Sequence, residues 1–418
     1  PGYTRAKVRE NYQRRFSITY PNEELPVARP MQTTPAYGIW KASRAVFGEA
    51  YGMEAVNYFA PEGEPLHETP SFRRSNAHRP TGEECRAVRE AVGINEIHNF
   101  GKYLVSGPGA RDWLDRIMAG RIPETGRISL TPMLSPKGRL IGDFTVSALA
   151  RDRFQLTSSF GAQAFHMRWF QSHLPASGVT IENVSTRRIG FQIAGPKARE
   201  LLSRVAKGDV SNAALRFMDA RAFDIGICRA LVQRLSYTGD LGYEIYVDAE
   251  DQVALYEILA EAGADLGLRP FGMRAMMSLR LEKFFGSWLR EFKPEYMPAE
   301  TGMDRFVSYN KPADFIGKAA AAREKAEGPS RRLSAFIVEA DDADVVAYEP
   351  IWHMGEVVGF CTSGGYAHHA RQSVALGFLP VELIAEGRAV EIEILGEMRP
   401  ARLVTTPPFD PDGARMRG

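Results

Sequence analysis

The sequence is short of cysteine and of long apolar stretches. It has three cysteines in 418 residues, Cys85, Cys228 and Cys361, and none of them forms a Cys-x-x-Cys motif. We therefore expect neither a disulfide framework nor a cysteine-based zinc site. No apolar run approaches the ~20 residues of a membrane span, and the first residues lack the apolar core of a secretory signal. We expect a protein of the cell interior, in the cytoplasm or, in a eukaryote, in the mitochondrial matrix.

The sequence also lacks an excess of charge of either sign. Its 52 basic and 51 acidic side chains leave a net charge of +1, so no general field attracts nucleic acid or a membrane surface, and neither is an expected partner. The glycine fingerprint of a dinucleotide-binding unit is missing too, because Gly107-Pro108-Gly109 has no third glycine. What is present, 25% charged and 44% hydrophobic residues, is typical of a globular protein with about two or three domains.

Residues 128–146 predict a strand, a tight turn and a second strand. The turn is Ser135-Pro136-Lys137-Gly138, in which Pro presets φ and Gly is free to adopt positive φ. One carboxylate, Asp143, interrupts the apolar second strand. A carboxylate in such a place must be solvated, paired or used, because burying it alone is costly. From this stretch alone, Asp143 is either a strand-edge residue held by backbone N–H groups or a functional acid.

An internal repeat follows. A strand, a Gly-Pro turn and a helix at 103–114 return at 191–202, and a further strand and helix follow each of them at nearly the same distance. We therefore expect two copies of a strand-helix-strand-strand-helix unit, near 102–175 and 190–265. Such paired units would form a cleft between them, with Asp143 supplied by the first copy and Glu244 by the second.

The two ends of the chain differ from this centre. Residues 1–80 are rich in aromatics, proline and arginine with weak periodicity, and form either an adaptor against another body or an irregular extension. A helix is expected to begin at Thr81, with Glu84 completing a capping box. Residues 331–418 alternate at a period of two and predict a small β-barrel or sandwich, with a tight bend at Gly364-Gly365-Tyr366.

Four stretches, taken in order, resemble the tetrahydrofolate-dependent aminomethyltransferase family, the T-protein of the glycine cleavage system. The run Tyr-Thr-Gly-Asp-Leu-Gly-Tyr-Glu that ends at Glu244 is similar to the family signature Tyr-Thr-Gly-Glu-x-Gly-x-Glu. The four stretches are 132–145, 235–246, 274–282 and 355–365. Residues 20–26 and 47–52 resemble the segment that joins the oxidase half of dimethylglycine and sarcosine dehydrogenases to their folate half.

The resemblance implies an α+β fold, a three-domain cloverleaf with folate in a central channel. Duplicated α+β units within 81–330 would be followed by the C-terminal β-barrel, and 1–80 would be the connection to an oxidase half. That half, with its FAD, is expected on a missing N-terminal part or on a partner subunit. Residues around 12–59 would dock onto this flavoprotein, since aromatic and arginine residues are enriched at interfaces.

The resemblance also implies roles for individual residues. Asp143 falls at the family's catalytic aspartate, beside the folate nitrogen that accepts the one-carbon unit. Tyr237 and Glu244 fall where relatives hold the pterin, whose adjacent N–H donors suit a charged acceptor. The other implied folate contacts are Arg274, Leu130, Thr157 and Ser159, the last in place of an asparagine. No metal is implied.

The implied function is transfer of a one-carbon unit from an oxidised N-methyl amine of the dimethylglycine or sarcosine type to tetrahydrofolate, which gives methylene-tetrahydrofolate. One alternative is a redox-free demethylase of the same fold that moves a methyl group directly to folate. Another is a folate-binding module without catalysis. His98, His368 and His369 are either general bases or, as we expect, solvated or satisfied structural histidines.

Overall fold

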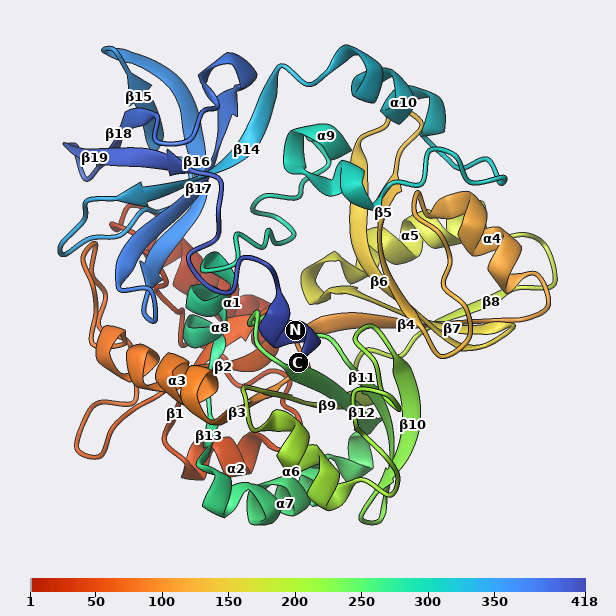
Figure 1. Cartoon of the computed structure of the whole chain (residues 1–418). Coiled ribbons are helices and arrows are strands. Elements are labelled where there is room, and N and C mark those ends of the chain that lie inside the picture. The colour runs from red at the N-terminus through yellow and green to blue at the C-terminus, as the bar shows by residue number, and fades with distance from the viewer. Residues whose placement is uncertain (1) are drawn as a thin grey trace.

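Two α/β sheets and a closed barrel organise the chain, which the computed structural model describes over residues 2–418. In Figure 1 the barrel lies at the upper left, the sheet of the first repeat at the right and the sheet of the second repeat at the bottom. This arrangement confirms the α+β fold class with duplicated units followed by a C-terminal barrel.

The first sheet is five-stranded, and its members come from one repeat copy and the strand that follows it. Its apolar face packs on two helices, which bury residues such as Trp113, Leu114 and Phe170. In spatial order the strands are β5 (Ile128–Leu134), β6 (Leu140–Ala150), β7 (Arg153–Ser159), β4 (Phe100–Ser106) and β8 (Thr180–Asn183). The helices are α4 (Ala110–Ile117) and α5 (Gln163–His173), with the short turn η1 (Phe160–Ala162) before α5.

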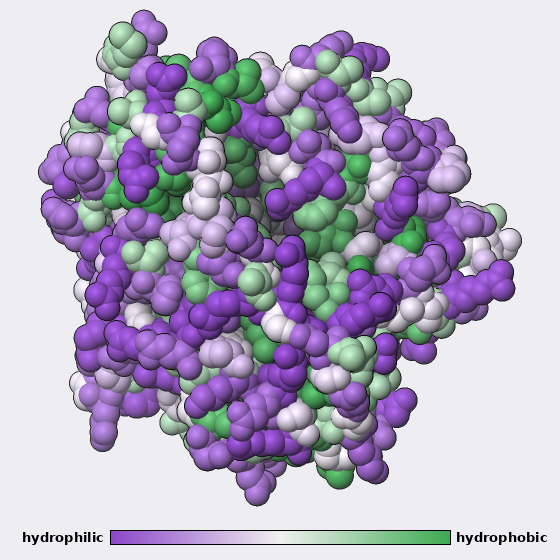
Figure 2. All heavy atoms as spheres, in the orientation of Figure 1, coloured by the Kyte–Doolittle hydropathy of each residue, from purple (hydrophilic) through white to green (hydrophobic). Residues whose placement is uncertain are grey.

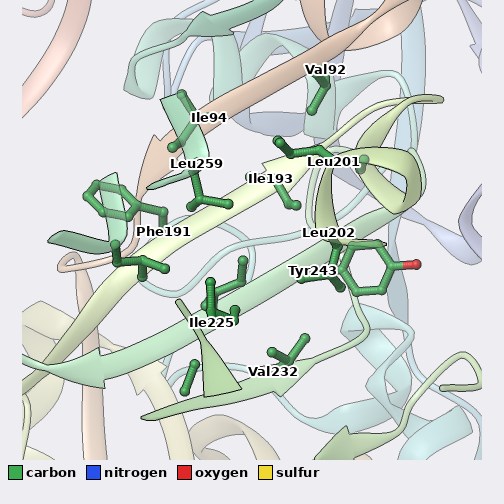
Figure 3. Packing of buried hydrophobic residues seen from close by; sticks show 14 of the residues in the cluster. Val92, Ile94, Phe191, Ile193, Leu201, Leu202, Ile225, Val232, Tyr243 and Leu259 are labelled. Carbon is green, nitrogen blue, oxygen red and sulfur yellow. The ribbon is translucent and has the colours of Figure 1, made fainter. Parts of the chain in front are cut away.

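The second sheet is six-stranded and repeats the pattern. Figure 3 shows its core, where Phe191, Ile193 and Tyr243 of the sheet pack with Leu201 and Leu259 of the helices. In spatial order the strands are β10 (Ala220–Ile225), β11 (Cys228–Gln233), β12 (Gly242–Asp248), β9 (Arg188–Ala194), β3 (Val92–Glu96) and β13 (Leu268–Pro270). The helical elements are α6 (Ala198–Val205), η2 (Ala249–Asp251), α7 (Gln252–Gly263) and η3 (Ala264–Leu266).

The two copies share their strand order and their turns. The order β5-β6-β7-β4 in one sheet corresponds to β10-β11-β12-β9 in the other. In each copy the strand-to-helix turn opens on a glycine in a conformation that disfavours side chains, with φ of 121° at Gly107 and 132° at Gly195. A Cβ at Gly107 would stand 2.4 Å from the Gly178 carbonyl oxygen, and one at Gly195 would stand 2.5 Å from that of Val88. The Gly-Pro motif is therefore a backbone requirement of the fold.

The N-terminal segment is more regular than its sequence pattern indicates. Its elements are α1 (Gly2–Gln13), α2 (Tyr37–Ala42), β1 (Ala45–Ala50) and β2 (Met53–Phe59). Trp40 and Tyr58 are buried in the chain's own core, and the Trp40 indole donates to Glu96 at 3.1 Å. The large exposed apolar residues of this segment include Val8, Tyr12, Phe16 and Ile18. Much of the stretch 37–59, expected as part of a docking surface, thus belongs to the core of this chain.

The predicted start of the helix at Thr81 is wrong. Helix α3 (His78–Glu90) begins three residues earlier, and no side chain caps it. The Glu84 carboxylate instead accepts hydrogen bonds from the backbone N–H groups of Phe59 at 2.7 Å and Gly272 at 2.8 Å. Glu84 therefore ties α3 to β2 and to the loop before α8, which a local capping pattern could not reveal.

The elements between the second sheet and the barrel are short. Helix α8 is rich in methionine, and its Arg280 pairs with Glu291 at 3.2 Å. These elements are α8 (Met273–Leu281), α9 (Pro298–Thr301), η4 (Met303–Phe306) and α10 (Lys318–Glu327).

The barrel closes through six strands. Four of these strands form two antiparallel hairpins, at 350–367 and 389–404. The tight bend expected at Gly364-Gly365-Tyr366 is absent: these residues continue β16, and the irregularity of this strand lies earlier, between Cys361 and Ser363. In closing order the strands are β14 (Arg331–Val338), β17 (Gln372–Pro380), β16 (Glu356–Ala367), β15 (Pro350–His353), β18 (Ala389–Ile394) and β19 (Glu397–Val404). The turns η5 (Val381–Leu383) and α11 (Ala414–Arg417) complete the chain.

The surface is largely polar. Figure 2 shows hydrophilic residues over most of one face, with hydrophobic ones gathered on the barrel and between the lobes. No helix in the described chain has the length and apolar character needed to cross a bilayer. All three cysteines are buried and free, and residues 2–418 hold no group of three or more His, Cys, Asp or Glu that could bind a metal.

Candidate functional site

Each sheet carries a polar row on the face opposite its helices. In the first sheet the row crosses four strands, because Leu130 pairs with Thr145, Thr145 with Thr157, and Thr157 with Lys102. Asp143 lies two residues before Thr145, so its side chain points to the same face. The predicted contacts Leu130, Thr157 and Asp143 therefore share one face of one sheet.

The corresponding row in the second sheet is entirely polar. Gln233 pairs with Glu244, Glu244 with Gln192, and Gln192 with Asn95, across β11, β12, β9 and β3. The Gln192 amide donates to Asn95 Oδ1 at 3.2 Å. Glu244 thus lies in the middle of this row.

The polar faces of the two sheets meet. A hydrophobic cluster beside these rows joins Ile128 of β5 to Ala220, Leu231 and Tyr246 of the second sheet. The Lys102 ammonium of β4 lies 6.0 Å from the centre of the Tyr246 ring. The polar rows therefore face each other between the two repeat copies.

The Asp143 side chain is half-buried, with one carboxyl oxygen in the interior. Its Oδ1 atom has no hydrogen-bond partner among residues 2–418. Burial raises the pKa of Asp143 to about 6, because a desolvated carboxylate is less stable than the neutral acid. A carboxyl with a pKa close to neutrality and a spare acceptor atom is suited to take a proton from a ligand.

Tyr237 lies close enough for its pKa to respond to the charge on Asp143. Burial raises the pKa of the Tyr237 phenol, and the Asp143 and Glu291 carboxylates raise it further against the opposing effect of Arg280. Its hydroxyl donates to the Gly286 carbonyl at 2.7 Å, and its ring lies nearly parallel to that of Phe285, 6.0 Å away. Tyr237 thus presents an oriented aromatic ring on the Asp143 side of the site.

Glu244 is buried with a single protein donor. Its Oε2 atom accepts a hydrogen bond from the Tyr246 hydroxyl at 2.7 Å. Burial raises the pKa of Glu244 to about 7, partly offset by this hydrogen bond and by the charge of Lys102. A carboxylate has about four lone-pair positions, so Glu244 retains most of its capacity to accept hydrogen bonds.

Several neighbouring polar groups are also without partners. Within residues 2–418, Gln155, Gln233, Ser147 and Thr157 have buried side-chain atoms that make no hydrogen bond. Buried polar atoms of this kind normally face a ligand or water, because an unmade hydrogen bond is expensive. Their position on the inner faces of both sheets fits a polar, planar ligand with several donors and acceptors.

Arg274 is placed elsewhere, at the wall of a cavity of about 220 Å³. Its guanidinium pairs with Glu68 at 2.9 Å and donates to Asn22 Oδ1 at 2.9 Å. Arg274 thus differs from the other predicted site residues, because its charge is paired with a carboxylate of the N-terminal segment.

Ser159 lines a larger cavity of about 540 Å³ with Trp288, Arg290 and Lys293. Arg290 borders both cavities, and no carboxylate of residues 2–418 pairs with it. Ser159 lies two residues beyond Thr157 on β7, so the face that carries the polar row leads to this cavity. Asp143, Tyr237 and Glu244 line neither cavity.

Family models match almost the whole chain. Residues 36–311 match the GCVT N-terminal domain, and residues 331–410 match the glycine cleavage T-protein C-terminal barrel domain. The chain belongs to the glycine cleavage T-protein family. It is an enzyme of the aminomethyltransferase type. Residues 1–34 match a further model, the FAD dependent oxidoreductase central domain.

Known relatives include a dehydrogenase and an aminomethyltransferase. Mitochondrial dimethylglycine dehydrogenase of Mus musculus is 37% identical over 99% of this chain and 48% of its own length. An aminomethyltransferase of Symbiobacterium thermophilum is 34% identical over 78% of this chain and 88% of its own length. The chain thus spans about half the length of the dehydrogenases that it matches.

The fold agrees with that of a solved T-protein. The aminomethyltransferase of the glycine cleavage system from Bartonella henselae matches with a TM-score of 0.79 at 22% identity, over 91% of this chain and 99% of that one. The predicted aminomethyltransferase architecture is therefore confirmed.

Of the histidines considered as general bases, His368 and His369 pack against other rings, whereas both ring nitrogens of His98 are buried without a hydrogen-bond partner in residues 2–418. His98 Nδ1 lies 3.3 Å from Glu96 Oε2, the His368 ring packs on His78 at 4.7 Å, and the His369 ring packs on Phe409 at 5.3 Å. Burial lowers the pKa of His368 to about 4, which leaves it neutral near pH 7.

Sequence reasoning missed Lys102, Gln233 and Arg290. Lys102 precedes the apolar run Tyr103-Leu104-Val105, and Gln233 follows a similar run in β11. A polar residue that alternates with buried ones indicates an outward face in an isolated sheet. Only the docking of the second sheet shows that this face is internal.

Proposed function

We propose that the chain transfers a one-carbon unit from an oxidised N-methyl amine of the dimethylglycine or sarcosine type to tetrahydrofolate, giving methylene-tetrahydrofolate. In this proposal it is the folate half of a demethylating dehydrogenase. The observation that carries the proposal is the half-buried Asp143 carboxyl, which has a pKa of about 6 and a buried Oδ1 atom without a hydrogen-bond partner in residues 2–418. This carboxyl belongs to the polar rows that face each other between the two copies, an arrangement that suits a planar heterocycle.

Asp143 acts as the proton acceptor. The folate nitrogen forms a bond to the carbon of the iminium or formaldehyde, and that nitrogen loses a proton as the bond forms. Asp143 takes this proton. A second folate nitrogen then bonds to the same carbon and loses its own proton as the bond from that carbon to the amine or hydroxyl group breaks, and both protons leave with the departing amine or water. A general base must lie within hydrogen-bond distance of the proton that it accepts, and its pKa must lie below the working pH. Burial raises the pKa of Asp143 to a value just below neutral pH.

Glu244 binds the pterin. The pterin edge presents adjacent N–H donors, and a carboxylate accepts both of them with charge-assisted hydrogen bonds. Gln233, its neighbour across β11, has both amide atoms free for the same ligand within the described chain. Tyr237 and Phe285 form an aromatic wall on the side of Asp143.

The remainder of the folate extends toward the cavity of about 540 Å³ beside Ser159. The benzoyl-glutamate part of folate ends in carboxylates, and Arg290 is a guanidinium on that cavity wall without an acidic partner in residues 2–418. Arg274 lines the adjoining cavity. It can contact folate, as predicted, only if the ligand displaces Glu68 from its guanidinium.

A flavoprotein supplies the oxidised amine in this scheme. The match of residues 1–34 to an FAD dependent oxidoreductase domain supports this partner, as do the exposed Val8, Tyr12, Phe16 and Ile18 around α1. We therefore expect the docking surface to consist of the exposed residues around α1 and not of the whole stretch 12–59. The same match favours methylene transfer over a redox-free methyl transfer, which needs no oxidase.

The test uses the full chain with formaldehyde and tetrahydrofolate. We expect it to bind tetrahydrofolate, to accelerate methylene-tetrahydrofolate formation above the uncatalysed rate, and to show no flavin absorbance and no oxidation of dimethylglycine or sarcosine. Formation of methyl-tetrahydrofolate from an unoxidised amine would support the redox-free alternative. Folate binding without any acceleration of methylene-tetrahydrofolate formation would indicate a folate-binding module without catalysis and would contradict the proposal.

A further inference from the structure

Lys102 is a buried lysine without an acidic partner in contact. Its side chain is fully buried, and its ammonium donates one hydrogen bond, to the Ile97 carbonyl at 3.2 Å. Among residues 2–418, no carboxylate lies within 4.0 Å of this ammonium. A buried ammonium has three donors to satisfy and is costly to desolvate, so a lysine here needs a compensating charge nearby.

Across the sheets, Tyr246 lies between Lys102 and Glu244. The Lys102 ammonium lies 6.0 Å from the Tyr246 ring centre, and the Tyr246 hydroxyl donates to Glu244 Oε2 at 2.7 Å. The ring therefore stands within cation–π range of the cation and in hydrogen-bond contact with the carboxylate. Thr157, the partner of Lys102 across β7, and Gln233, the partner of Glu244 across β11, are uncharged.

Two carboxylates face Lys102, and one of them is committed elsewhere. Burial lowers the pKa of Lys102 to about 7, and the charges of Glu244 and Glu96 raise it against that effect. Glu96 accepts hydrogen bonds from Trp40 and Gln252 and lies 3.3 Å from His98 Nδ1. Glu244 has Tyr246 as its single donor within residues 2–418. Glu244 is therefore the carboxylate whose charge depends on Lys102.

We propose that Lys102 is a positioning residue, the counter-cation that keeps Glu244 ionised when Glu244 takes up a ligand with paired N–H donors. This inference rests on the proposed function, in which that ligand is the pterin. A neutral Glu244 has a hydroxyl group that faces N–H donors unfavourably, whereas the carboxylate accepts from both. When the ligand binds, any proton held by Glu244 moves to Lys102 and leaves the pair with the same number of protons.

The test measures tetrahydrofolate binding to the full chain by calorimetry from about pH 6 to about pH 9, for the wild type, K102M, K102R and E244Q. We expect K102M to bind about tenfold or more weakly than the wild type near pH 7 and to recover as the pH rises, because Glu244 then ionises without help. K102R keeps the charge and should restore binding near pH 7. A K102M profile that follows the wild type at every pH would overturn the inference.

A second measurement uses the unmodified chain, so it does not depend on the folding of a variant. Titrations in buffers of different ionisation enthalpy give the number of protons released on binding. Near pH 7 a pair that passes the proton from Glu244 to Lys102 releases close to none, whereas a Glu244 with a pKa of about 7 that loses its proton to solvent releases about half a proton. Release of about half a proton would overturn the inference alone. Wild-type chain that fails to bind, or E244Q that binds equally well, would overturn the proposed function and this inference with it.

Discussion

The two repeat copies have the same strand order but carry different polar residues on their inner faces. Ser147 pairs with Gln155 in the first sheet as Gln233 pairs with Glu244 in the second, so Gln155 and Glu244 hold equivalent positions. Four residues before Ser147 stands Asp143. Four residues before Gln233 the second copy has Arg229 instead.

The environments of these residues differ as strongly as their identities. Asp143 has a buried oxygen without a partner in the described chain, whereas Arg229 is exposed and pairs with Asp224 at 2.8 Å. Glu244 has a tyrosine donor and a lysine nearby, whereas Asp143 has neither. Duplication thus supplies a common scaffold, and we infer that the first copy carries proton transfer while the second carries ligand binding. The following predictions test this division.

The largest effect is expected from D143N, which keeps the shape of the side chain and removes its basicity. The transfer rate at saturating tetrahydrofolate should fall by about 10²–10⁴-fold, the usual contribution of a positioned acid or base. Asp152→Asn, at an exposed aspartate in the turn after β6, is the matched control and should leave the rate unchanged. Unchanged turnover in D143N would remove Asp143 from the chemistry.

A smaller effect is expected from Glu244→Ala. Loss of a charged acceptor that faces paired donors should weaken tetrahydrofolate binding by about 1.5–3 kcal/mol, measured by calorimetry. Gln155→Ala, at the equivalent position of the first copy, is the control and should weaken binding less. If the two variants lost the same affinity, the copies would share binding equally.

The shared scaffold makes its own prediction. Gly107→Ala and Gly195→Ala should each lower the free energy of unfolding by about 1–3 kcal/mol, because both turns need positive φ and both lack room for a Cβ. Gly38→Ala, in helix α2 with open space around its Cα, should be neutral or slightly stabilising. Urea denaturation compares the three variants. A loss in only one of the two repeat variants would show that the turns are not equivalent.

The pH dependence of transfer gives the smallest expected change. Burial has raised the pKa of Asp143 to about 6, so the base form is lost as the pH falls through that value. The rate at saturating folate should fall about tenfold per pH unit below about pH 6 and level off above it. Saturation removes the separate titration of Glu244 from the profile. D143N should lack this limb, and a limb that persists in D143N would belong to another group.

The architecture was largely predictable from the sequence, and the relation between its parts was not. The repeat, the strand–turn–strand around Asp143 and the barrel hairpins follow from local periodicity and turn chemistry. Lys102 was not recognised, because its burial arises only when a second sheet covers the polar face. Likewise, Arg274 pairs with Glu68, far away in the sequence, so no local pattern could show that its charge is neutralised.

The measurement that tests the division of labour most directly determines both the transfer rate at saturation and the tetrahydrofolate dissociation constant for D143N and Glu244→Ala. We predict a crossed result: D143N loses rate and keeps most of its affinity, and Glu244→Ala loses affinity and keeps most of its rate at saturation. Parallel losses of rate and affinity in both variants would contradict the account, since they would show that the two acids act as one unit.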